Sequence, residues 1–228
     1  TCLAKVRRQQ EILLNNYYAD ISKHSGKSNS MHITRVLQSI PAQLSREIDG
    51  SSGKFKFTGV VPKISKYSRL AASFDWLQAA GLIYKVPIID HCEEPLQAQV
   101  KDSQFKLYLF DIGLLGALGN LSPESILNYD FGTQKGYFVE NFVLQELFLN
   151  AHKSIYCWRH NQSEIEFVVS GPEGVVPIEV KAGRYRRAKS LGVFESKYKP
   201  KDSYVMTSEI PRINSRKYYP HYFTSKIL

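Results

Sequence analysis

The sequence predicts a mixed α/β (α+β) fold with a helical first part and a strand-rich second part. Apolar residues recur at helical spacing along residues 6–21 and again along 68–80. The second part holds short segments typical of strands at 164–169 and 175–181, separated by a turn that contains Gly and Pro. Hydrophobic residues make up 43% of the 228 residues, so the chain can build a core and is not wholly disordered.

Helices followed by a β-hairpin are expected in the first part. The helical segments are 6–21, 31–40 and 68–80. The third carries an apolar stripe of Leu70, Phe74 and Leu77, and Gly81 follows as a helix stop. Strands are expected at 82–86 and 96–100, joined by residues 90–95. This order is that of a winged-helix-like domain, with 68–80 as the recognition helix and the hairpin as the wing.

Basic residues near the start of the expected recognition helix allow two interpretations. Lys63, Lys66 and Arg69 would meet phosphates or bases if this helix enters a groove of DNA. Alternatively, the first part is a small helical module for packing or dimerisation, because the helix offers few side chains that read bases.

The second part is expected to begin near residue 120. Residues 105–118 are strongly apolar and bridge the two parts, and residues 118–123 interrupt that pattern. The expected domains are therefore 1–120 and 121–228. The expected elements of the second domain are helices at 137–149 and 189–198 and strands at 155–159, 164–169, 175–181 and 204–208.

Charged residues interrupt two otherwise apolar strands of the second domain. Side chains alternate along a strand, so Glu179 and Lys181 share a face, as do Glu164 and Glu166. If that face is the same one, carboxylates and an ammonium converge on a site for a hard cation such as Mg²⁺ or Mn²⁺. Lys181 would position a water molecule or stabilise the negative charge that develops on a scissile phosphate. The alternative is a solvated face with a cross-strand ion pair.

Four stretches of the second domain, 136–147, 156–159, 164–168 and 177–183, resemble one known family. It is the C-terminal domain of prokaryotic AAA-type ATPases, catalogued as domain of unknown function 4143, which is similar to PD-(D/E)xK nucleases. Residues 13–23 and 105–115 resemble the segments that precede this domain in the family. The resemblance implies a restriction-endonuclease-like αβββαβ core after a winged-helix-like segment, and an ATPase domain upstream as partner.

The resemblance also implies roles for individual residues. Glu179 and Lys181 match the family's Glu-x-Lys, and Glu166 falls where the nuclease pattern has Asp. These three are the candidate catalytic residues. Glu140 matches the helix acid that completes some metal sites, so the candidate metal ligands are Glu140, Glu166 and Glu179. Glu is one methylene longer than Asp, which shifts the ligand geometry and favours a degenerate site.

Phosphate-loop fragments occur in the first domain but are incomplete. Gly26-Lys27-Ser28 and Gly53-Lys54 lack the remaining Gly or Ser/Thr of the motif. The sequence therefore predicts no ATP site in this fragment.

The charge balance predicts an anionic partner. The chain has 30 basic and 21 acidic residues, a net charge of +9, which favours nucleic acid (DNA) over a membrane surface. Candidate contacts are Lys66, Arg69 and a basic run directly after the Glu-x-Lys motif, Arg184, Arg186, Arg187 and Lys189. The alternative for this run is a solvated loop and helix start.

Other features restrict the location of the protein. Cys2, Cys92 and Cys157 match no zinc spacing, and an odd count argues against a disulfide framework, so free thiols in the cytoplasm are expected. No apolar run is long enough to cross a bilayer. The chain does not begin with Met, so a fragment of a longer protein is expected.

Three functions remain open from the sequence. The first is a nucleic-acid-binding module of an ATPase-linked protein, with a nuclease-like, degenerate metal site. The second is an active metal-dependent DNA endonuclease. The third is a non-catalytic module for homo-oligomerisation or partner binding.

Overall fold

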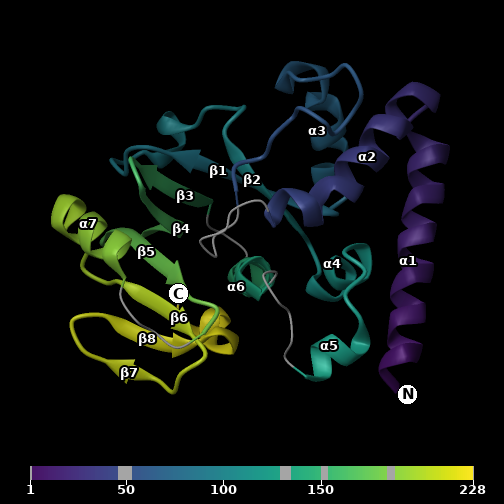
Figure 1. The fold of residues 1–228 in the computed structure, drawn as a ribbon. Helices are drawn as coiled ribbons and strands as arrows, with labels where there is room; N and C mark the ends of the chain where they lie inside the picture. The colour runs from purple at the N-terminus through teal and green to yellow at the C-terminus, as the bar shows by residue number, and fades with distance from the viewer. Residues whose placement is uncertain (1, 46–52, 129–134, 150–153, 184–187, 228) are drawn as a thin grey trace.

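A computed structural model describes residues 2–45, 53–128, 135–149, 154–183 and 188–227 (Figure 1). Its α-helices are α1 (Cys2–His24), α2 (Lys27–Leu44), α3 (Ala71–Ala79), α4 (Ile112–Leu118), α5 (Pro123–Leu127), α6 (Lys135–Leu149) and α7 (Lys189–Tyr198). Its strands are β1 (Ile83–Ile89), β2 (Phe105–Leu109), β3 (Ile155–His160), β4 (Ser163–Gly171), β5 (Gly174–Val180), β6 (Tyr204–Thr207), β7 (Arg212–Ile213) and β8 (Lys217–Pro220). The predicted mixed α/β class is confirmed.

All these strands belong to one mixed sheet with the order β2-β1-β3-β4-β5-β6-β8-β7. β1 pairs antiparallel with β2 and parallel with β3, so the sheet continues from the first part of the chain into the second. β3, β4 and β5 form an antiparallel meander, and β6 is parallel to β5. The predicted boundary near residue 120 falls between α4 and α5, while the sheet extends across both parts.

The predicted strand at 96–100 is wrong. Residues Leu96–Gln99 form a short 3-10 helix, and the partner of β1 is β2. Every residue of β2 is buried, whereas between Leu96 and Gln99 only Leu96 is. Burial of an entire apolar strand outweighs the weak local alternation at 96–100.

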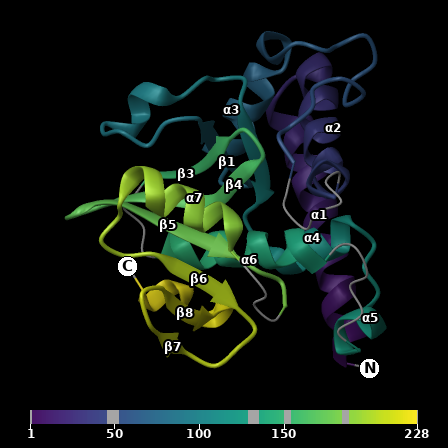
Figure 2. The same ribbon diagram turned by 60° about the vertical axis from the view of Figure 1, so that its left-hand side comes forward.

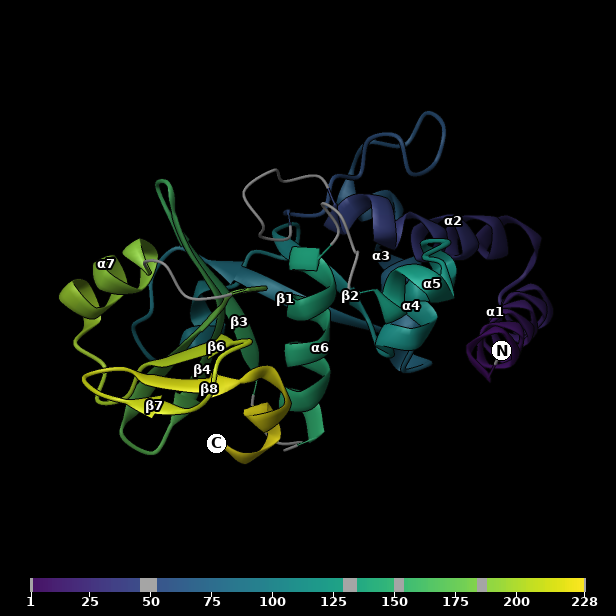
Figure 3. The same cartoon turned by 60° about the horizontal axis from the view of Figure 1, so that its bottom comes forward.

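Helices α6 and α7 cover opposite faces of the sheet (Figure 3). Val143 and Leu144 of α6 pack in one core with Phe167 of β4. Leu191 and Phe194 of α7 pack in a second core, which includes Trp158 of β3. Helices α1, α2 and α4 lie together at one end of the molecule, away from β6–β8 (Figures 1 and 2). No described helix is long and apolar enough to cross a membrane, as predicted.

Candidate functional site

The site lies where β4 and β5 separate. The last paired residues of these strands are Phe167 and Ile178, so the next along each strand are Glu166 and Glu179. Beyond this pair, the backbone N–H of Val180 donates to Glu166 Oε2 at 2.8 Å instead of to a backbone carbonyl. A side-chain carboxylate therefore ends the ladder and satisfies a buried donor.

Glu179 and Lys181 form an ion pair in which Lys181 Nζ lies 2.6 Å from Glu179 Oε1. This contact agrees with the prediction that they share a face. The side chain of Glu179 is 2% exposed and that of Lys181 is 35% exposed, so of this pair the lysine is the more accessible to solvent. Lys181 is also held by its backbone, since its N–H donates to the Met206 carbonyl (2.9 Å) and its carbonyl lies 2.8 Å from His221 Nε2.

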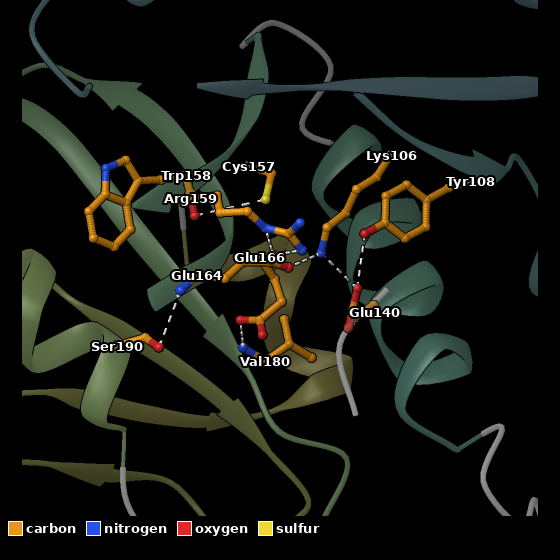
Figure 4. Close-up of polar contacts among 10 residues, drawn as sticks. All are labelled: Lys106, Tyr108, Glu140, Cys157, Trp158, Arg159, Glu164, Glu166, Val180 and Ser190. Carbon is orange, nitrogen blue, oxygen red and sulfur yellow. Dashed lines mark hydrogen bonds and ion pairs between the residues drawn. The ribbon is translucent and has the colours of Figure 1, made fainter. Parts of the chain in front are cut away.

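A β-bulge separates Glu164 from Glu166. Between the pairs Tyr156–Val168 and Trp158–Ile165, β3 advances by two residues and β4 by three. The strict alternation behind the prediction that Glu164 and Glu166 share a face is therefore interrupted. Their carboxylates are directed to different partners (Figure 4): Glu166 to Val180, and Glu164 to Lys106 and Arg159.

A second charged cluster, around Lys106, lies beside the first cluster of Glu166, Glu179 and Lys181. Lys106 of β2 is fully buried, forms an ion pair with Glu164, and lies 3.7 Å from Glu140 Oε2. The Tyr108 hydroxyl donates to the same Glu140 oxygen at 2.9 Å. Arg159 Nε donates to Glu164 Oε2 at 2.5 Å. Sequence reasoning missed Lys106, although a lysine inside the apolar stretch Phe105–Leu109 is the same signal that singles out Glu179.

Burial and neighbouring charge alter the acidity of the site. Desolvation raises the pKa of Glu166 well above its usual range, the nearby Glu179 carboxylate raises it further, and Lys181 opposes both. Desolvation also raises the pKa of Glu179, against the influence of Lys181. The pKa of Lys181 is raised because the two carboxylates outweigh the effect of its burial. Lys181 thus does not fully offset the cost of ionising Glu166 and Glu179 in this buried place.

In the second cluster, the pKa of the carboxyl group is lowered instead of raised. Burial opposes the charge of Glu164, but Lys106 and Arg159 outweigh it and lower the pKa of that carboxyl. Glu164 is therefore a fully paired carboxylate.

The residues present fit a hard cation held by two carboxylates. Glu179 Oε2 is buried and has no hydrogen-bond partner among the described residues. This buried carboxylate oxygen could serve as a ligand of a divalent cation, which would supply the interaction that the oxygen lacks. Within the described ranges, no group of three or more His, Cys, Asp or Glu side chains is arranged to hold a metal ion. A cation on Glu166 and Glu179 would complete its shell with other oxygen ligands.

The candidate nucleic-acid contacts that the structure describes lie in two separate places. Lys66 and Arg69 are exposed just before α3, and Lys189 is exposed at the start of α7. Figures 1 and 3 show α3 and α7 well apart. Arg184, Arg186 and Arg187 lie outside the described residues.

Comparison with protein families assigns both parts of the chain. Residues 3–125, more than half of the chain, match the model described as Domain of unknown function (DUF8612). The chain belongs to the DUF8612 family. Residues 135–219 match a second model, Domain of unknown function (DUF4143), which confirms the predicted resemblance for this stretch. The segment before it belongs to DUF8612 instead, and neither match is to an ATPase domain.

The two matches divide the charged clusters. The DUF8612 stretch contains Lys106. The DUF4143 stretch contains the other charged residues, Glu140, Glu164, Glu166, Glu179 and Lys181. No curated protein and no solved structure shows significant similarity to the chain.

Proposed function

We propose that this chain is a nucleic-acid-binding module with a nuclease-like site that holds one divalent cation, Mg²⁺ or Mn²⁺, on Glu166 and Glu179. One observation carries the proposal. The two buried carboxylates and the Lys181 ammonium meet where β4 and β5 separate, and Glu179 Oε2 has no hydrogen-bond partner among the described residues.

The order of the elements supports a nuclease-like core. The succession α6-β3-β4-β5-α7-β6, with an antiparallel meander and a parallel last strand, is compatible with the αβββαβ plan of PD-(D/E)xK proteins. The order α1, α2, α3 and the β1–β2 hairpin is likewise compatible with a winged-helix-like segment. An upstream ATPase domain as partner belongs to the same proposal through the resemblance, and a location in the cytoplasm belongs to it because free thiols are expected there.

Each residue has a distinct task in this proposal. The cation, when bound, supplies positive charge that polarises a phosphate. Glu166 and Glu179 hold it, and the backbone N–H of Val180 orients the Glu166 carboxylate. Lys181, charged and 35% exposed, offers hydrogen bonds to a phosphate oxygen or a water molecule. The net charge of +9 favours the approach of nucleic acid.

Titration calorimetry with Mn²⁺ tests the cation site. Wild-type protein is expected to bind one equivalent, and Glu179→Gln is expected to weaken binding by at least about tenfold, because the neutral amide removes the buried carboxylate ligand. Glu173→Gln is the matched control, since Glu173 is an exposed carboxylate in the turn after β4. Absence of binding to well-folded wild-type protein would remove the cation site from the proposal.

An active endonuclease is the second candidate, favoured by the half-buried Lys181 side chain beside the carboxylates. Double-stranded DNA with Mn²⁺ distinguishes the candidates. DNA binding that persists in EDTA, together with no cleavage when Mn²⁺ is present, supports the binding module. Cleavage in Mn²⁺ that Lys181→Met abolishes supports the enzyme. Absence of DNA binding at low salt would leave a module for assembly with other proteins.

A further inference from the structure

Lys106 is a buried cation that the DUF8612 stretch contributes to the DUF4143 stretch. It lies in β2, and its side chain is 0% exposed. An ammonium removed from water is stable in a fold only when it is paired with negative charge. Its carboxylate partners, Glu140 in α6 and Glu164 in β4, both lie on the other side of the family boundary.

The Lys106 ammonium contacts two carboxylates, those of Glu164 and Glu140. Its ammonium forms an ion pair with Glu164 and lies 3.7 Å from Glu140 Oε2, so it sits between the two carboxylates (Figure 4). Arg159 also binds Glu164, and the Tyr108 hydroxyl donates to Glu140. Because Lys106 is fully enclosed, it cannot swing into solvent to make room for another cation.

We infer that Lys106 is a built-in cation that engages Glu140, and that the nuclease-like site therefore holds one divalent cation on Glu166 and Glu179 rather than two. The inference rests on the proposed function for the identity of the cation site. Lys106 acts through Glu140 and is a positioning residue. The hairpin of β1 and β2 must dock on β3 before this charge arrangement exists.

A double-mutant cycle in EDTA tests the ion pair without any cation. Wild type, Lys106→Met, Glu140→Gln and the double variant are unfolded with urea. Coupling of the two positions is expected to change the unfolding equilibrium constant by at least about tenfold. Lys85→Met with Glu140→Gln is the matched control, because Lys85 lies on the neighbouring strand and contacts the Tyr67 hydroxyl instead. Independent effects at positions 106 and 140 would overturn the inference.

Calorimetry with Mn²⁺ tests the consequence for the site. Glu140→Gln alone is expected to change the affinity by less than about twofold, since Glu140 already has its cation. Lys106→Ala, which removes the ammonium and leaves room, is expected to raise the stoichiometry from about one to about two. Adding Glu140→Gln is expected to return it to one.

The two proposals fail in different ways. Wild-type binding that Glu140→Gln abolishes would overturn the role of Lys106 and leave the cation site intact. No binding by wild-type protein would defeat the cation site, and the cycle in EDTA would still decide whether Lys106 and Glu140 form a pair. If Lys106→Ala does not fold, Glu140→Gln, a nearly isosteric change, decides alone.

Discussion

Glu166 illustrates how burial changes one side chain. It is 3% exposed, accepts a hydrogen bond from Val180 and lies near a second buried carboxylate, Glu179. Burial and the neighbouring carboxylate disfavour the charged form, so the pKa of Glu166 is raised well above the usual range. In the folded protein, Glu166 therefore keeps its proton at pH values where an exposed Glu has lost it.

The stability of the protein should depend on pH through Glu166. The folded state binds this proton more tightly than the unfolded state, so the contribution of Glu166 to the free energy of unfolding is fully present below the ordinary Glu pKa of 4.5. It falls as pH rises toward the raised pKa of the folded state, with a slope of up to about 1.4 kcal/mol per pH unit. Glu166→Gln removes this titrating group, so the free energy of unfolding, measured with urea at a series of pH values above 4.5, should fall less steeply with pH than in wild type.

Glu173→Gln, a change of an exposed carboxylate, should leave that slope as in wild type. If Glu166→Gln and wild type show the same dependence on pH, the pKa of Glu166 does not differ between the folded and unfolded states, and the raised pKa is contradicted. Added Mn²⁺ should reduce the wild-type slope, since a bound cation replaces the proton.

Three hydrogen bonds of two side chains, Asn141 and Asp111, hold elements around β2 in place. The Asn141 side chain of α6 donates to the Leu109 carbonyl (2.9 Å) and accepts from the Leu109 N–H (3.0 Å). The Asp111 side chain caps α4 by accepting from the Leu114 N–H at 2.8 Å. These contacts fix α6 and α4 relative to the strand that carries Lys106.

The Asp111 cap makes a quantitative prediction at the scale of one element. Asp111→Ala leaves the N–H of Leu114 without its partner and should lower the free energy of unfolding by about 1 kcal/mol. Asp102→Ala, at an exposed turn position, is the control and should change it by less than about 0.5 kcal/mol. Equal shifts of the urea midpoint for both variants would show that the cap contributes nothing measurable.

The hairpin shows where local patterns mislead. Residues 83–89 are a strand, close to the predicted 82–86, because β-branched and aromatic residues recur there. Its partner was predicted at the nearest alternating segment, 96–100, but the structure pairs it with 105–109. Which segment pairs with β1 depends on which one is buried under other elements of the fold. A short stretch of sequence does not contain this information.

The whole molecule is organised around one sheet shared by two family stretches. β1 and β2 come from the DUF8612 stretch, and β3 to β8 come mostly from the DUF4143 stretch. β1 is joined to β3 by parallel pairing, and the core on the α6 face includes residues of both stretches. Neither stretch completes its sheet and core alone, so the two should unfold together.

Cooperative unfolding can be tested with the two tryptophans. Trp76 lies in α3 and Trp158 in β3, one in each stretch. In a Trp158→Phe variant, Trp76 fluorescence reports the first stretch while far-UV circular dichroism reports the whole chain. The two urea transitions should coincide. A fluorescence transition that precedes or follows the dichroism transition would show that the stretches unfold independently.

The sequence by itself determined the mixed fold class, the segments of most helices and strands, and the choice of Glu166, Glu179 and Lys181. The fold class and the elements depend on side-chain periodicity, and Glu179 and Lys181 stand out as charges within an apolar strand, which are local properties. The choice of Glu166 over Glu164 came from the resemblance to the family. Only the tertiary structure decided the partner of β1, the separation of Glu164 from Glu166, and the position of Lys106 beside Glu140. The reason is physical: a bulge, a strand pairing and a buried ion pair each depend on residues distant in the chain, whose contacts exist only once the sheet has formed.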